Sequence, residues 1–454
     1  MASRLFGTDG VRGLANGELT ASLATSLGVS AAQVLVEHGG LPSGKNERLF
    51  AIVGRDPRVS GEFLQAALSA GLASAGVDVL DVGVVPTPAV AYLTEVTGAA
   101  LGVMISASHN AMPDNGIKFF ARGGHKLADD MEDAIEAHME TISELPVGAA
   151  VGRIRTDLSL VEKYVSHVLT SISDSLTGIT LVVDSANGAA SVVGPEIYRR
   201  AGATVITIHS EPNGYNINED CGSTHMDDLV QAVKEHGADL GIAHDGDADR
   251  CLAVDANGEL VDGDQILAIL AVGRKQRGLL VDNTVVATVM SNLGFTLAMK
   301  SEQIEVIATA VGDRYVLEAM RERGLNLGGE QSGHVVLSDF ATTGDGVLTA
   351  LQIMAEMKYS QNSLATLATI VTRLPQVLIN VKDVDKSATG KPELVAAISQ
   401  AEQILGETGR VLLRPSGTES VIRVMVEAAT AAQAQDTAQQ LATLVQKHCA
   451  LSSQ

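Results

Sequence analysis

The stretch from Gly102 to Phe120, GVMISASHNAMPDNGIKFF, decides the fold. An apolar run over residues 101–105 predicts a buried strand, and it ends abruptly in SASHN at residues 106–110, small and polar residues typical of a tight turn. Ligands of open α/β sheets bind outside the carboxyl ends of the strands, so we expect the hydroxyl of Ser108 to lie at a binding site. Lys118 follows an Asp-Asn-Gly turn and returns a cation to the same place.

The overall composition favours a multidomain α/β protein. The chain has 454 residues, too many for one compact core, so three or four domains are expected. Hydrophobic residues make up 46% of the chain and aromatic residues only 3%, so the cores must be packed from Ala, Val, Leu and Ile. Such a composition suits layered strands and helices rather than a secreted or disordered protein.

Charge and cysteine usage limit the partners and the compartment. A net charge of -22 argues against nucleic acid or an anionic membrane as partner, so an anionic substrate would need cations gathered locally. No segment approaches about 18 consecutive apolar residues, and the start has no apolar leader region. Cys221, Cys251 and Cys449 are scattered, as fits a reducing compartment. We therefore predict a soluble cytoplasmic protein.

Strands and helices are expected to alternate along the chain, as in parallel-type α/β folds. One of these helices should have Thr87 as its N-cap and Pro88 in its first turn. Another is expected from residue 158 to about residue 172. The tail from residue 374 reads as strand, helix, strand pair and final helix, which indicates a different, smaller α+β unit.

The pattern Gly-x-x-Leu-Gly occurs at residues 98–102, 237–241 and 324–328, each time after a helix-like segment. Each copy leads at nearly the same offset into an unusual polar loop: SASHN, HDGDADR and GGEQSGH. This recurrence predicts three related α/β domains with mixed sheets around a central cleft, plus a smaller C-terminal α+β domain. The expected boundaries are 1–155, 156–259, 260–373 and 374–454.

The second loop places Asp245, Asp247 and Asp249 at alternate positions. In an extended backbone this spacing puts the three carboxylates on one side, where their oxygens converge on a divalent cation. The loop is not an EF-hand, because Arg250 stands at its sixth position, where that motif needs Gly. Three ligands do not fill an octahedral Mg²⁺ shell, so water or a phosphate oxygen must complete it, which points back to Ser108.

Two other loops carry groups suited to a phosphosugar. The loop at 328–334 offers a carboxylate, a hydroxyl and an imidazole, from Glu330, Ser332 and His334. The segment RPSGTE at 414–419, followed by Arg423, combines guanidinium groups, hydroxyls and backbone N–H donors, as a phosphate dianion requires. Arg12, between glycines in FGTDGVRG at 6–13, suits anion capture.

Taken together and in this order, the four loops resemble those of the α-D-phosphohexomutases, and the resemblance covers essentially the whole chain. Within that superfamily the chain is most similar to the phosphoglucosamine mutases, on FGTDGVRG, on NINEDCGSTH at 216–225 and on GGEQSGH. It departs from the usual pattern at Ala111-Met112, where Pro-Tyr is common, and at Ser420, where a Pro commonly follows Thr-Glu.

The resemblance implies a role for each candidate residue. Ser108 would be a phosphoserine in the active enzyme, with Asp245, Asp247 and Asp249 holding Mg²⁺ against its phosphate. Glu330 and Ser332 would bind sugar hydroxyls. The transfer site would be lined by His109, Lys118, Arg250 and His334, with Lys118 and His334 as candidates for proton transfer. The phosphate that is not reacting would be held by Arg414, Ser416, Gly417, Thr418 and Arg423.

The reaction implied is the interconversion of glucosamine 6-phosphate and glucosamine 1-phosphate through a sugar 1,6-bisphosphate. The same chemistry on mannose or glucose phosphates is the nearest alternative. An aspartyl-phosphate phosphatase built on Asp245 and Asp247, a Ser-His hydrolase and a non-catalytic phosphosugar sensor are further alternatives, each a poorer match. The sequence leaves the oligomeric state open, with a homodimer among the states that it allows.

Overall fold

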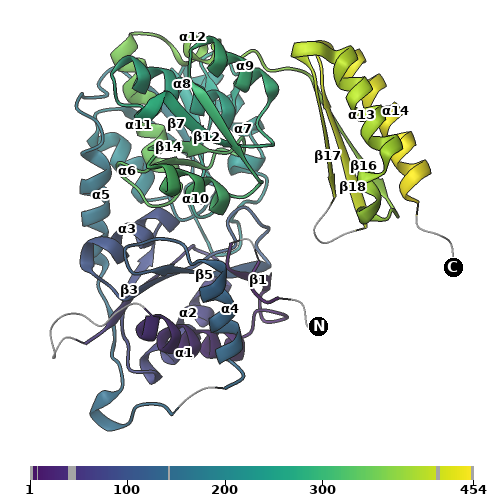
Figure 1. Cartoon of the computed structure of the whole chain (residues 1–454). Coiled ribbons are helices and arrows are strands. Elements are labelled where there is room, and N and C mark those ends of the chain that lie inside the picture. The colour runs from purple at the N-terminus through teal and green to yellow at the C-terminus, as the bar shows by residue number, and fades with distance from the viewer. Residues whose placement is uncertain (1–3, 8, 39–47, 142–143, 416–419, 451–454) are drawn as a thin grey trace. The chain divides into compact units, whose positions relative to one another are not determined.

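The computed structural model describes residues 4–7, 9–38, 48–141, 144–415 and 420–450. Its contacts divide the chain into two compact units, Met1–Val289 with Ile304–Thr369, and Met290–Gln303 with Ile370–Gln454. Figure 1 labels many of the elements of both units. Within the described residues, no helix is both long enough and apolar enough to cross a membrane.

The first sheet of the larger unit has the strand order β1-β5-β4-β2-β3-β6. Strand β4 is parallel to β2, β2 to β3 and β3 to β6, whereas β5 runs antiparallel to both of its neighbours. The strands are β1 Val11–Leu14, β2 Phe50–Arg55, β3 Asp78–Val84, β4 Leu101–Ile105, β5 Asp114–Ala121 and β6 Ile154–Thr156. The helices of this part are α1 Ala21–His38, α2 Val59–Ser74, α3 Thr87–Thr97 and α4 Asp129–His138.

The second sheet has the order β11-β10-β9-β7-β8, with β7, β8 and β9 parallel and the hairpin β9–β10 antiparallel. Its strands are β7 Thr180–Asp184, β8 Thr204–Ile208, β9 Leu240–Ala243, β10 Leu252–Asp255 and β11 Leu260–Val261. The helices beside it in the chain are α5 Val161–Leu169, α6 Val193–Arg200 and α7 Asp227–His236.

The third sheet has the order β13-β12-β14-β15 and again ends in an antiparallel hairpin, β14–β15. Its strands are β12 Thr284–Thr288, β13 Glu305–Thr309, β14 Leu327–Gly329 and β15 Val335–Leu337. The accompanying helices are α8 Gly263–Gln276, α10 Asp313–Arg323, α11 Gly346–Ser360 and α12 Leu364–Ala368.

The repeated glycine pattern is the junction between a helix and the first strand of each hairpin. Gly98, Gly237 and Gly324 cap the C-terminal ends of α3, α7 and α10 in the left-handed conformation, with φ of 71°, 58° and 65°, which only glycine adopts at no steric cost. The second glycine of each copy lies under a side chain of that helix, so a Cβ there would collide with it. All three polar loops are therefore the same structural element, the loop between an inner strand and its antiparallel return.

The smaller unit is an antiparallel sheet of order β16-β18-β17 with helices packed on it. Its core gathers apolar residues of the sheet and of α14, such as Val424 and Leu441. The N-cap of α9, Asn292, donates to Glu427 of β18 over 3.2 Å. The elements are α9 Leu293–Ser301, β16 Gln376–Lys382, α13 Pro392–Leu405, β17 Arg410–Pro415, β18 Val421–Glu427 and α14 Ala431–Cys449.

This architecture confirms the predicted fold class of α/β parts with mixed sheets followed by a smaller α+β part. Two local predictions were wrong. Thr87 is not the N-cap of α3 but its first residue, with Pro86 as the N-cap. The Asp-Asn-Gly sequence at 114–116 is not a turn but the start of strand β5. The helix expected over 158–172 is shorter, because a 3₁₀ turn at Leu158–Leu160 precedes α5. The four domain boundaries and the common cleft stay predictions.

Candidate active site

Ser108 lies in the turn between β4 and β5, called here the serine turn (residues 106–111). Its φ is 53°, a left-handed conformation that costs a non-glycine residue about 1–2 kcal/mol, so the surrounding structure must hold it. The residue is 1% exposed. Its hydroxyl donates to Oδ2 of Asp245 over 2.5 Å, and its backbone N–H donates to the hydroxyl of Ser106 over 3.0 Å.

Arg58 holds the serine turn from the side of the first sheet. The side chain is completely buried and forms an ion pair with Asp56 over 3.0 Å. Its remaining N–H groups donate to the carbonyl oxygens of Ser108, Asn110 and Ala111 over 3.1, 2.8 and 2.8 Å. Arg58 is therefore a scaffold residue, since its charge is neutralised and its donors are used on backbone.

Asp245, Asp247 and Asp249, called here the aspartate cluster, follow β9 and are almost fully buried. Each offers one oxygen, and these oxygens lie within 4.8 Å of one another. Oδ1 of Asp247 and Oδ1 of Asp249 are buried and have no hydrogen-bond partner in the described part of the chain. Buried carboxylate oxygens without partners are costly, and a hard divalent cation would satisfy them. The donor set thus fits a metal site.

The carboxyl groups of the cluster are shifted in opposite directions. Burial, reinforced by the neighbouring charges of Asp249 and Asp247, raises the pKa of Asp245 to about 7. At Asp249 burial acts the same way, but the charge of Lys118 and other nearby groups outweighs it and holds the pKa of that carboxyl well below its usual value. Buried carboxylates as close as these need compensating positive charge to stay ionised.

Lys118 and Arg250 supply part of that compensation. The Lys118 ammonium is 2.8 Å from both Asp247 and Asp9 and 3.6 Å from Asp249. Burial disfavours its charged form, but Asp247 and Asp9 outweigh this and raise the pKa of Lys118. Nε of Arg250 lies 4.0 Å from Asp245 and 3.9 Å from Asp249, at the edge of ion-pair range.

The histidines have opposite surroundings. His334 lies between two carboxylates, with Nδ1 3.7 Å from Asp249 and Nε2 3.4 Å from Asp313. Burial opposes its charged form, yet Asp313 and Asp249 raise the pKa of His334. Nδ1 of His109 is 3.3 Å from the Ser108 hydroxyl. Burial, followed by the charges of Arg250 and Arg12, lowers the pKa of His109 to about 4.

The sequence did not reveal a chain of ion pairs in which acidic and basic side chains alternate and which leads to Lys118. The ammonium of Lys126 is 2.6 Å from Asp9 and also pairs with Asp313, the residue that contacts His334. Asp9 in turn pairs with Arg12 over 2.7 Å and with Lys118 over 2.8 Å. Asp9 stands in the quoted FGTDGVRG segment, so the segment was noticed but only its arginine was interpreted.

The structure brings most of the predicted residues of the larger unit together. Glu330 belongs to the group, since its charge acts on Arg250, and its carboxylate accepts the N–H of Gly312 over 3.1 Å. Ser332 lies in the same hairpin loop as Glu330 and His334, and its buried hydroxyl has no hydrogen-bond partner among the described residues. The predicted residues in direct contact with Asp245, Asp247 or Asp249 are Ser108, Lys118, Arg250 and His334. Arg12 and His109 join the group indirectly, Arg12 through Asp9 and His109 through Ser108.

In the smaller unit, Arg414 of β17 and Arg423 of β18 lie directly opposite each other. Like charges at such positions repel, and neither arginine has an ion-pair partner within the described residues. This arrangement would be stabilised by an anion. The other predicted phosphate-binding residues, Ser416, Gly417 and Thr418, lie outside the described residues.

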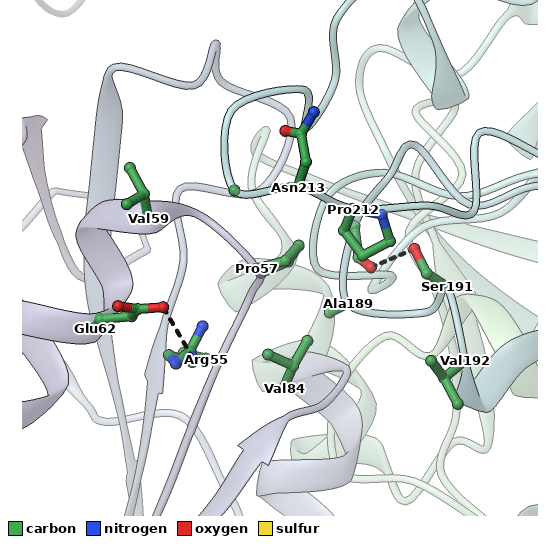
Figure 2. A pocket seen from close by; sticks show the side chains of 12 residues that line it. Arg55, Pro57, Val59, Glu62, Val84, Ala189, Ser191, Val192, Pro212 and Asn213 are labelled. Atoms are coloured by element: carbon green, nitrogen blue, oxygen red, sulfur yellow. Dashed lines mark hydrogen bonds and ion pairs between the residues drawn. The ribbon is translucent and has the colours of Figure 1, made fainter.

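A separate cavity of about 390 Å³ lies in the larger unit and is drawn in Figure 2. It contains the weak ion pair of Arg55 with Glu62, at 3.9 Å, and apolar side chains such as Val59 and Val192. None of the predicted site residues that the structure describes lines it.

A second group of side chains that could hold a metal consists of Asp184, His209 and Cys221. It is arranged around hydrogen bonds that Asp184 accepts from His209 and from the N–H of Gly222, both over 2.9 Å.

Comparison with known proteins identifies the family of the chain. Models of the phosphoglucomutase/phosphomannomutase family match nearly the whole chain: alpha/beta/alpha domain I over residues 3–146, domain II over 162–258, domain III over 262–374 and the C-terminal domain over 378–444. A phosphoglucosamine mutase of a Nocardioides species is 60% identical over 450 residues, which cover 99% of this chain and 100% of that protein.

Solved structures share the fold at low identity. A phosphoglucomutase/phosphomannomutase family protein of Burkholderia thailandensis superposes with a TM-score of 0.81 at 22% identity over 100% of both chains. An Aspergillus fumigatus N-acetylphosphoglucosamine mutase, solved with GlcNAc-6P and magnesium, gives a TM-score of 0.67 at 17% identity over 98% of this chain and 96% of that one. The chain therefore belongs to the phosphoglucosamine mutases, phosphohexomutase isomerases of the phosphoglucomutase/phosphomannomutase family.

Proposed function

We propose that this chain interconverts glucosamine 6-phosphate and glucosamine 1-phosphate by passing a phosphoryl group through Ser108. The observation that carries the proposal is the 2.5 Å hydrogen bond from the buried Ser108 hydroxyl to Asp245 of the aspartate cluster. A hydroxyl held against carboxylates that have unpartnered oxygens is placed where a phosphate ester and a cation would meet.

The metal of the proposal is Mg²⁺, held by Asp245, Asp247 and Asp249, with an oxygen of the Ser108 phosphate as a further ligand. The unpartnered oxygens of the cluster support this assignment, as does the magnesium in the solved fungal relative. When bound, the ion neutralises charge on the phosphoryl group that is being transferred.

The catalytic cycle starts from the Ser108 phosphoester. The free hydroxyl of the sugar monophosphate attacks its phosphorus, the bond from phosphorus to the serine oxygen breaks, and a sugar 1,6-bisphosphate forms. After the bisphosphate turns over, Ser108 takes back the other phosphoryl group. Lys118 and Arg250 balance the charge that develops. Lys118 and His334 are the candidates that move the proton between the sugar hydroxyl and Ser108, and the raised pKa of Lys118 favours His334 of the two.

Substrate recognition in this proposal must serve both orientations of the sugar. Glu330 and Ser332 bind the hydroxyls at C3 and C4, which lie between the two exchanging ends. Arg12 contributes to anion capture. The phosphate that is not reacting binds to Arg414, Ser416, Gly417, Thr418 and Arg423, and the uncompensated arginine pair of β17 and β18 supports this assignment.

Phosphomannomutase or phosphoglucomutase activity by the same mechanism is the second candidate, because the matching family models carry both names. Assaying the phosphates of glucosamine, mannose and glucose side by side, with Mg²⁺ and catalytic sugar bisphosphate, separates the two. We expect the highest kcat/KM for glucosamine 6-phosphate, and a preference for mannose phosphate would overturn the choice.

The proposal includes a cytoplasmic location, which the free and buried thiols of Cys221, Cys251 and Cys449 support. A homodimer stays a prediction.

A further inference from the structure

Asn218 belongs to the segment NINEDCGSTH at 216–225. This segment is one of those that carry the family resemblance, but the resemblance implies no chemical role for its residues. The segment lies between β8 and α7 of the second sheet and contains the short 3₁₀ helix η3, Gly222–Thr224, with Asn218 before that helix. The side-chain amide of Asn218 nevertheless reaches the serine turn of the first sheet. It donates to the carbonyl oxygens of Ser108 and Asn110, both over 2.9 Å.

These two carbonyls are the ones that Arg58 also binds, over 3.1 and 2.8 Å. The serine turn is therefore held from two sides, by an arginine of its own sheet and by an amide of the neighbouring sheet. The left-handed φ of Ser108 makes such support necessary, because an unsupported turn would relax to a more common backbone conformation.

The loop that carries the aspartate cluster, residues 245–249 and called here the aspartate loop, packs against both the Ser108 carbonyl and the Asn218 amide. Gly246, between Asp245 and Asp247, lies so close that a Cβ on it would come within 2.5 Å of the Ser108 carbonyl oxygen and 3.0 Å of the Asn218 amide nitrogen. The carbonyl of Ser108, the amide of Asn218 and the backbone of the aspartate loop are thus packed together without room for one methyl group. Asn218 is therefore placed to hold the Ser108 hydroxyl at its distance from Asp245.

Asn218 is itself well anchored. Its backbone N–H donates to the carbonyl of Ala186 over 3.0 Å, and the preceding residue, Ile217, is buried. Farther along the segment, the N–H of Gly222 donates to Asp184 at the end of β7 over 2.9 Å. The amide is therefore held on a fixed part of the second sheet, which is what a group that positions another turn requires.

We propose that Asn218 is a positioning residue for phosphoryl transfer, which fixes the serine turn against the aspartate loop by donating to the carbonyls of Ser108 and Asn110. The inference rests on the proposed function, because it assumes that Ser108 carries the phosphoryl group. Asn218 touches neither sugar nor metal in this role, so its loss should slow transfer while substrate binding stays intact.

The test compares Asn218→Ala with Asn216→Ala in the full-length phosphorylated protein. Asn216 is the matched control, since its side chain bonds to the backbone of Asn213 and Glu211 and, within the described residues, forms no hydrogen bond with the serine turn. We expect kcat of N218A to fall by about ten- to a hundredfold, with KM for glucosamine 6-phosphate within about twofold of wild type. N216A should retain wild-type kcat.

Phosphorus NMR of the phosphoserine gives a readout that a purely structural role would not move. The resonance should shift or broaden in N218A and stay unchanged in N216A, at a temperature where both variants are folded. If N218A melts far below wild type, Asn218→Asp replaces it, because it keeps the side-chain volume and removes the N–H donors. Wild-type kcat and an unshifted resonance in the folded Asn218 variant would overturn the inference. A wild-type protein with no phosphate on Ser108 or no mutase activity would instead overturn the proposed function.

Discussion

The hydroxyl of Thr87 donates a hydrogen bond to Oδ2 of Asp247 over 2.5 Å, and the backbone N–H of Thr87 donates to the carbonyl of Asp247 over 2.9 Å. The first turn of α3, which belongs to the first sheet, thereby fixes Asp247, the middle residue of the aspartate cluster, which follows a strand of the second sheet. This leaves Oδ1 of Asp247 unpartnered within the described residues, and so available to a cation. Groups that orient a metal ligand in this way typically contribute about 10- to 100-fold to metal affinity.

Replacing Thr87 by Val should therefore weaken the metal site. We expect the Mg²⁺ concentration for half-maximal activity to rise about tenfold, with kcat at saturating Mg²⁺ near the wild-type value, because the shape of the side chain is kept. Thr97→Val is the control, since the one hydrogen bond of that hydroxyl among the described residues is to the carbonyl of Leu93 in its own helix. An unchanged Mg²⁺ requirement in T87V would contradict the interpretation of this hydrogen bond.

Ser108→Ala should remove turnover, by more than about a thousandfold, because no other group takes over the phosphoryl carrier. The variant should fold, since only one hydroxyl is lost. Intact-protein mass measurement should find a phosphoryl group on active wild-type protein and none on S108A. Phosphate on Asp245 instead would favour the phosphatase alternative, and full retention of function by S108A would favour a sensor.

Lys126→Met should destabilise the larger unit. The substitution removes the cation that bridges the partly buried carboxylates of Asp9 and Asp313. Asp9 keeps its pairs with Arg12 and Lys118, so the loss should stay below the about 3–5 kcal/mol that breaking a fully buried pair costs. Thermal unfolding should show a clear drop in Tm for K126M. Combining it with Asp313→Asn removes the charge that loses its ammonium partner and should restore part of the loss. A double variant no more stable than K126M would argue that the bridge is not the cause.

Asp345 predicts a pH dependence of stability. It caps α11 by accepting the N–H of Leu348 over 2.9 Å, and burial raises its pKa to about 6 against that hydrogen bond. The folded protein then keeps a proton that the unfolded chain has released, so stability decreases as pH rises from about 4 to about 6 and changes no further above. Asp345→Asn should lack this contribution, which is on the order of 3 kcal/mol. Melting curves across pH 4 to 7 test it, and a difference between wild type and D345N that is constant with pH would contradict it.

The arginine pair in the smaller unit should affect stability and binding in opposite directions. Replacing Arg423 by Gln removes a repulsion with Arg414, so the ligand-free protein should become more stable by about 0.5 kcal/mol. The same change should raise KM for sugar phosphates, because one guanidinium fork is lost. Lys382→Gln on the exposed part of β16 serves as control, with neither effect expected. If R423Q leaves KM unchanged, the pair is not part of the phosphate site.

Several contacts of the candidate site could be predicted, because they depend on where strands end and on the spacing of residues close in sequence. The abrupt end of β4 and the alternate aspartates after β9 are local patterns, and the strand-end rule correctly brought Ser108 to Asp245. The hydroxyl of Thr87 was assigned to its own helix, because sequence patterns describe caps but not partners 160 residues away. The bridge of Lys126 to Asp313 was missed for the same physical reason, since it depends on how the first and third sheets pack and has no periodic signal.

The recurring junction of helix, left-handed glycine, inner strand and returning strand has an evolutionary consequence. If the chain arose by triplication of one such unit, it obtained three equivalent loops between an inner strand and its return strand. The sequence of each loop can change while the glycine junction before it stays the same. Serine chemistry, cation binding and sugar recognition could then be acquired one copy at a time, without redesign of the scaffold.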